Sequence, residues 1–82
     1  MSRGHGKLQR RLLQILNTEA RPFETFELTA QVFAVSADDV TNVQVVAVRR
    51  ALQTLAHEGA IFDLGYGHSR RKLWANERPY WA

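Results

Sequence analysis

The sequence predicts a mainly α-helical domain that ends in a small β-hairpin. Three segments before Gly59 repeat apolar side chains at helical spacing, and beyond it the period becomes that of short strands. A length of 82 residues suits one domain with one modest core. We therefore expect a single domain over residues 1–82, with its core in 7–75, a flexible N-terminus in 1–6 and an aromatic tail in 76–82.

The first helix is expected over Lys7–Glu19. Its apolar residues fall at i, i+4, i+7 and i+8, which is one face of a helix, and cationic or amide side chains take the other side. Pro22 prevents the helix from continuing much further.

The second helix is expected over Thr25–Phe33. Thr25 is predicted to be its N-cap, with its hydroxyl accepting from a first-turn amide, and Glu27 suits the positive end of the helix dipole. Phe23 either forms a short extended segment or packs against the start of this helix.

The third helix is expected over Thr41–Glu58. Thr41 and Gln44 form a capping box, in which each side chain bonds the backbone N–H of the other residue. The apolar positions from Val45 onward recur at i, i+3, i+7 and i+10. The valine-rich start also suits a strand, but the length favours a helix that ends with Gly59 at C′.

Two strand-like runs, Ala60–Leu64 and Arg70–Ala75, surround a Gly-rich connection and predict a hairpin over Ala60–Ala75. The glycines of this connection are expected to take positive φ angles in the turn. The core predicted for the whole domain comprises Leu8, Leu12, Ile15, Leu16, Leu28, Val32, Val48, Leu52, Leu55 and Phe62.

Charge is segregated along the chain, although the net charge is only +3. Residues 1–21 carry five Lys or Arg and one Glu (net +4), and residues 22–48 carry four acids and no Lys or Arg (net −4). Residues 49–82 carry six Lys or Arg and three acids (net +3). Such a distribution gives a small domain a basic face, which either binds a polyanion or merely keeps the protein in solution.

Other function classes find little support. Cysteine is absent, and His5, His57 and His68 are scattered without the partners of a metal or catalytic site, so we expect no metal, no cofactor and no enzymatic activity. No apolar run approaches the length of a membrane span, and no secretory signal is expected at the N-terminus. A cytoplasmic location is expected, with the nucleoid as the site if the source is bacterial.

The segment 65–72, GYGHSRRK, allows two interpretations. Two glycines around an aromatic residue suggest a phosphate-binding loop, but such a loop leads into a helix, and the residues after Gly67 have strand character. The segment is better explained as the tip and returning arm of the hairpin, with cations for a polyanion.

The order of helix, short helix, long helix and hairpin resembles the winged helix-turn-helix DNA-binding family over Lys7–Ala75. The resemblance rests most on Val46–Ile61, with its Arg-Ala-Leu step, a Leu three residues later, and Glu-Gly before the hairpin. It implies a three-helix winged helix-turn-helix, with residues 41–58 in a major groove and the hairpin, or wing, on an adjacent backbone or minor groove. Asp38 and Asp39 depart from the pattern, because phosphates would come near them.

The resemblance and the helical rotation of about 100° per residue together predict a DNA-binding surface. On the recognition helix it comprises Thr41, Asn42, Val43, Val46, Ala47, Arg49, Arg50 and Thr54, and on the wing His68, Ser69, Arg70, Arg71 and Lys72. Arg50 and Asn42 have the geometry for guanine and adenine edges, whereas the wing cations are expected to grip phosphates.

These observations predict a sequence-specific protein that binds double-stranded DNA, such as a small transcriptional regulator or a plasmid or phage DNA-binding factor. The alternative is a winged helix that binds another protein through its acidic middle segment and aromatic tail. A homodimer is a further alternative, and no membrane partner is expected.

Overall fold

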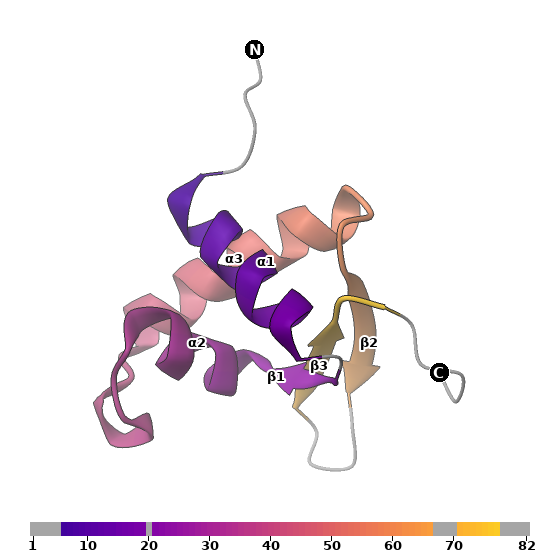
Figure 1. Ribbon diagram of the computed structural model, residues 1–82. Helices are drawn as coiled ribbons and strands as arrows, with labels where there is room; N and C mark the ends of the chain where they lie inside the picture. The colour runs from indigo at the N-terminus through magenta and orange to yellow at the C-terminus, as the bar shows by residue number, and fades with distance from the viewer. Residues whose placement is uncertain (1–5, 20, 67–70, 78–82) are drawn as a thin grey trace.

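The computed structural model describes residues 6–19, 21–66 and 71–77 (Figure 1). The predicted helices and hairpin are confirmed, with ends that shift by one or two residues. The predictions of a flexible N-terminus and an aromatic tail fall largely on residues 1–5 and 78–82, outside the described residues. The elements are α1 (Lys7–Thr18), β1 (Phe23–Glu24), α2 (Thr25–Phe33), the 3-10 helix η1 (Ala37–Asp39), α3 (Asn42–His57), β2 (Phe62–Tyr66) and β3 (Lys72–Ala75).

The hairpin is part of a three-stranded antiparallel sheet in the order β1-β3-β2. The short strand β1 pairs Phe23 with Trp74 of β3, which confirms the extended segment that was one of the two alternatives for Phe23. Because β1 leads directly into α2, the pairing holds the wing against the start of that helix (Figure 1).

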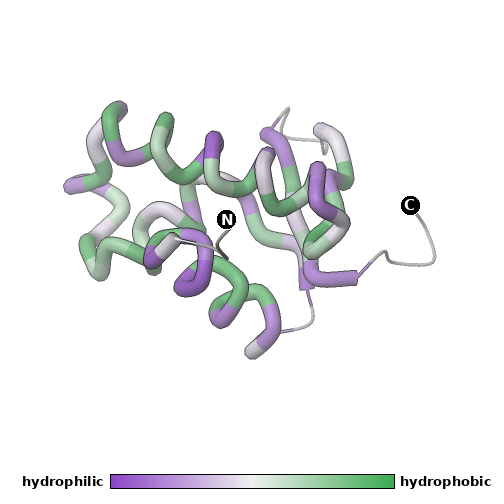
Figure 2. Tube along the Cα trace, turned by 90° about the horizontal axis from the view of Figure 1, so that it is seen from above, coloured by the Kyte–Doolittle hydropathy of each residue, from purple (hydrophilic) through white to green (hydrophobic). Residues whose placement is uncertain are grey.

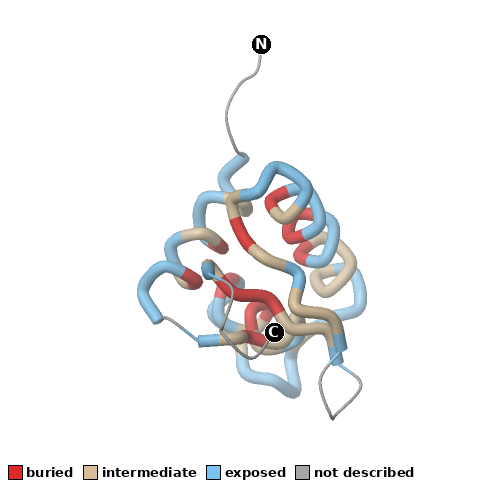
Figure 3. Tube along the Cα trace, turned by 90° about the vertical axis from the view of Figure 1, so that its right-hand side faces the viewer, coloured by how far each residue is buried: buried red, intermediate tan, exposed pale blue. Residues whose placement is uncertain are grey.

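The core lies between the three helices and the sheet (Figure 3). Most of the predicted core residues are buried, while Leu8 and Ile15 are half-buried and pack against them. Phe62 was wrongly placed in the core, since it is only half-buried and Ile61 is buried instead. The buried core cluster comprises Leu12, Leu16, Phe23, Leu28, Val32, Val48, Ala51, Leu52, Leu55, Ile61 and Trp74.

Both ends of α3 follow from local sequence. The hydroxyl of Thr41 accepts from the backbone N–H of Gln44 at 3.2 Å, and the Gln44 side chain accepts from the N–H of Thr41 at 3.0 Å, so the capping box is confirmed. Gly59 has φ +84°. The N–H of Ala60 then bonds the Leu55 carbonyl at 2.9 Å in a Schellman-type turn, which directs Ile61 rather than Phe62 toward the core.

Thr25 is not the N-cap of α2. Glu24 holds that position, and no side chain caps the helix there. The Thr25 hydroxyl instead accepts a hydrogen bond from the indole N–H of the buried Trp74 at 2.8 Å. The Thr25 side chain, which is chemically suited to an N-cap, thus links α2 to the sheet.

Arg21 stabilises the connection between α1 and α2 through contacts with three residues. Its guanidinium lies 3.9 Å from the centroid of the Phe23 ring and donates to the carboxylates of Glu27 at 2.6 Å and Glu19 at 2.9 Å. These hydrogen bonds, the one to Glu27 most of all, raise the pKa of Arg21 above its ordinary value. Arg21 is therefore a structural cation.

Gly65 was predicted in the hairpin turn, but it lies within β2. It has φ +76°, and the pairing register between β2 and β3 shifts between Asp63 and Tyr66. The Gly65 N–H donates to the Asp63 carboxylate at 2.8 Å, so Gly65 serves a bulge, where its positive φ is tolerated. Gly67, the second glycine of that prediction, lies outside the described residues.

Replacing Trp74 by Phe should lower the free energy of unfolding by roughly 1–3 kcal/mol, because the Thr25 hydroxyl loses its donor. Urea titration of Trp74→Phe, Thr25→Val and the double variant measures this as a cycle. The two losses should be less than additive. Strictly additive losses would show that the hydrogen bond contributes nothing.

Candidate nucleic-acid interface

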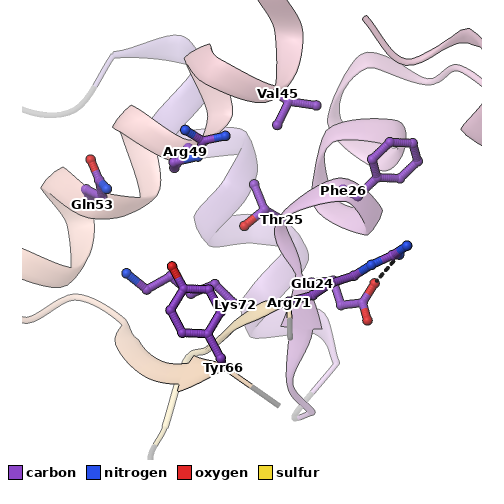
Figure 4. A pocket seen from close by; sticks show the side chains of 9 residues that line it. All are labelled: Glu24, Thr25, Phe26, Val45, Arg49, Gln53, Tyr66, Arg71 and Lys72. Atoms are coloured by element: carbon purple, nitrogen blue, oxygen red, sulfur yellow. Dashed lines mark hydrogen bonds and ion pairs between the residues drawn. The ribbon is translucent and has the colours of Figure 1, made fainter. Parts of the chain in front are cut away.

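A groove of about 590 Å³ lies between α3, the start of α2 and the wing (Figure 4). Three segments that are distant in sequence meet there, because the β1–β3 pairing brings the wing to the start of α2. The groove is lined by Glu24, Thr25, Phe26, Val45, Arg49, Gln53, Tyr66, Arg71 and Lys72.

The wall formed by α3 consists of Val45, Arg49 and Gln53. These residues are spaced by four, so they follow one another along a single side of the helix (Figure 4). Val45, which begins the apolar repeat predicted for this helix, is half-buried and lines the groove. Gln53 was missed, although its spacing from Arg49 places both on one side of the helix.

On the wing side, Tyr66 is 72% exposed and Lys72 is half-buried. The Lys72 ammonium lies 2.9 Å from a carboxylate oxygen of Asp63, 5.3 Å from the centroid of the Trp74 ring and 5.8 Å from that of Tyr66. The aromatic rings and the carboxylate hold this cation beside the groove.

Arg71 also has an acidic partner, since its guanidinium lies 3.2 Å from the Glu24 carboxylate (Figure 4). The Arg71 side chain is 62% exposed, and exposed ion pairs of this kind are worth at most about 1 kcal/mol. A phosphate can therefore replace Glu24 as the partner of Arg71 at small cost.

Arg49 is exposed and has no ion pair within the described part of the chain. It faces the groove with Arg71 and Lys72, so three cations surround a space whose lining contains one acid, Glu24. The groove therefore favours an anion.

The remaining predicted residues of the recognition helix lie outside the groove as far as the described residues show. Thr41, Asn42, Val43, Arg50 and Thr54 are exposed, and Val46 and Ala47 are half-buried. Two hydroxyls are already engaged, because that of Thr41 caps α3 and that of Thr54 donates to the Arg50 carbonyl at 3.1 Å. The predicted wing residues His68, Ser69 and Arg70 lie outside the described residues.

Asp38 and Asp39 occupy the exposed 3-10 helix η1, and neither lines the groove. Asp39 accepts a hydrogen bond from the Ser36 hydroxyl at 3.0 Å. These two aspartates therefore leave the charge of the groove lining unchanged.

Two features are absent from the described residues. No group of three or more His, Asp or Glu side chains among them is arranged to hold a metal ion. None of their helices has the length and hydropathy required to cross a membrane.

Comparison with known proteins adds one likeness. Neither the protein-family models nor the curated proteins contain a match to this chain. Among solved structures, this chain superposes on a domain of HOP2 with a TM-score of 0.65. That structure comes from work on the DNA recognition and protein interaction domains of HOP2 and on its homologous DNA pairing properties. The two chains share 23% sequence identity, over 85% of this chain and 98% of that one. At this identity the likeness concerns the fold, and three helices with a three-stranded antiparallel sheet form a winged helix.

Proposed function

We propose that the protein binds double-stranded DNA, with α3 in the major groove and the wing along the adjacent backbone. The observation that carries this proposal is Arg49, which has no ion pair among the described residues and faces a basic groove between α3 and the wing. The winged-helix fold supports it, and so does the likeness to a structure from work on the DNA recognition and protein interaction domains of HOP2.

The exposed side of α3 suits a major groove. The helix has 16 residues, so it is about 24 Å long, and a major groove about 12 Å wide accepts an α-helix. Arginine pairs with two acceptors of guanine, and glutamine pairs with the donor and acceptor of adenine. Arg49 and Gln53 are therefore our candidates for base contacts from within the groove, with Asn42 and Arg50 beside them.

The wing supplies contacts of a different kind. Arg71 and Lys72 have long cationic side chains whose acidic partners can be exchanged for phosphates. Such contacts set the position of the protein on a duplex without reading its bases. We therefore propose that the wing contributes affinity for DNA and fixes the position of the protein on the duplex, whereas α3 selects the DNA sequence.

This arrangement favours binding rather than catalysis. A role as a small transcriptional regulator, or as a plasmid or phage DNA-binding factor, fits a domain that reads a short sequence. Selection of bound duplexes from a random pool tests this role, and a pool that stays random would contradict sequence-specific binding.

Exposed apolar side chains favour a second candidate, binding to another protein. Phe33 is 37% exposed at the end of α2, and Val43 is 78% exposed at the start of α3, with the acidic η1 between these helices. A partner with apolar and basic side chains would complement this surface. Selection of DNA without any preferred sequence, together with a stable protein complex, would favour this candidate.

Replacing Arg49 by Ala should weaken binding to the selected duplex by roughly 1–3 kcal/mol and weaken binding to scrambled duplex much less, because a guanine contact is lost. Fluorescence anisotropy on both duplexes measures the difference. Arg50→Ala is the matched comparison, since Arg50 is the adjacent exposed cation on α3 and the sequence predicts it as a base contact. Equal losses on both duplexes would reduce either arginine to a phosphate contact.

Replacing Glu24 by Gln should strengthen DNA binding by about 0.5–1 kcal/mol, roughly twofold to fivefold, because the groove loses its acid and Arg71 is released. Glu58→Gln is the control, since it changes the net charge equally at the C-cap of α3, outside the groove lining. Equal gains in the two variants would reflect net charge alone. An unchanged or weaker affinity for Glu24→Gln would contradict the proposed path of the DNA.

A further inference from the structure

The outer face of α1 carries a compact group of cations. Lys7, Arg10 and Arg11 are exposed, and their spacing at i, i+3 and i+4 places them on one side of the helix around Gln14. Helix α1 contains no acidic residue between Lys7 and Thr18. This side of the helix, which we call the α1 basic face, therefore has a uniform positive charge.

The cations of the α1 basic face have no acidic partner within the described part of the chain. In contrast, Arg21 is paired with Glu19 and Glu27, and the two wing cations Arg71 and Lys72 are paired with Glu24 and Asp63. Among the described residues, no ion pair has to be broken before the α1 basic face contacts an anion.

The α1 basic face is separate from the groove. No residue of α1 lines the groove. Figures 2 and 3 show α1 and α3 on opposite sides of the domain. The buried Leu12 and Leu16 point from α1 into the core. Lys7 and Arg10 lie on the opposite side of the helix, Arg11 lies at the edge of that side, and all three cations are exposed. A ligand on the α1 basic face would leave α3 free.

The spacing of these cations suits a phosphate backbone. The helix rises about 1.5 Å per residue, so Lys7 and Arg11 are about 6 Å apart along its axis. Successive phosphates of one strand are about 3.4 Å apart along the duplex axis, so the three flexible side chains can reach neighbouring phosphates. The first turn of α1 contains no acid, and the positive end of the helix dipole there adds to the attraction.

We propose that the α1 basic face is a second DNA-backbone contact surface, so that one molecule holds two duplex segments on opposite sides. The first of these segments is the one on α3 and the wing, and in that respect the inference rests on the proposed function. The second contact is independent of sequence, because cations that meet phosphates read no bases.

The test is a capture experiment with the whole chain. One biotinylated duplex with the preferred sequence is immobilised, protein is added, and retention of a second, fluorescent duplex of scrambled sequence is measured. Anisotropy with the preferred duplex alone reports the first contact. The test variant is Lys7→Gln/Arg10→Gln/Arg11→Gln, and the charge-preserving control is Lys7→Arg/Arg10→Lys/Arg11→Lys. Thermal unfolding shows whether each variant is folded.

The wild-type protein and the charge-preserving control should retain the second duplex. The test variant should lose at least about tenfold of that retention, while its affinity for the preferred duplex alone changes by less than about threefold. The salt dependence of retention should also weaken, with a slope of log affinity against log salt lower by about 0.9 for each cation removed. The single variant Arg11→Gln gives this slope change if the triple variant does not fold.

Each failure has a separate meaning. Wild-type protein that binds one duplex but retains no second one, or full retention by the test variant, overturns the second surface and leaves the proposed function standing. Equal loss in both triple variants also overturns it, because charge would then not be the cause. If no duplex binds α3, as shown by an unchanged affinity of the Arg49→Ala/Arg50→Ala variant, the proposed function fails, whatever the α1 basic face does. Retention of an acidic polypeptide in preference to DNA would assign the α1 basic face to a protein partner and contradict the inference.

Discussion

The buried indole of Trp74 joins the sheet to the helices, and the rest of the arrangement depends on that connection. Trp74 pairs with Phe23 across the two strands, and its N–H donates to the hydroxyl of Thr25 at 2.8 Å. Because β3 is the central strand, this one residue positions both β1 and β2. Without it, the wing would lose its fixed place beside α3, and the groove would have no second wall.

The fold separates two kinds of cation. In the groove, Arg71 and Lys72 are held by acids, while Arg49 has no ion pair among the described residues. On α1 the cations are exposed and have no acid beside them in the helix. The paired cations of the wing are oriented and cost little to release, so they favour a defined docking position, whereas the unpaired cations of the α1 basic face can meet any phosphate chain. The same small domain thereby offers surfaces suited to selective and to unselective binding.

The sequence predicts best those structural features that are determined by residues close to one another in the chain. The helices were predicted well because caps and apolar spacing act within a few residues, as at Thr41 and Gly59. The N-cap predicted at Thr25 and the placement of Gly65 in the turn were wrong because the roles of both residues depend on pairing within the sheet, and Trp74 is 49 residues from Thr25. The positive φ predicted for Gly65 is confirmed. The candidate site was predicted only in outline. Helical rotation identifies an exposed side of α3, but only the position of the wing selects Arg49 and Gln53 as the residues that face it.

Amide chemical-shift mapping tests most directly whether a bound duplex lies across α3 and the wing. The ¹⁵N-labelled protein is titrated with one equivalent of a preferred duplex, and the shifts are mapped on the described residues. A duplex in this position should give the largest changes in Asn42–Gln53 and at Tyr66, Arg71 and Lys72, with small changes in η1. Changes confined to Phe33–Val40, or no changes at a concentration that saturates binding, would contradict it.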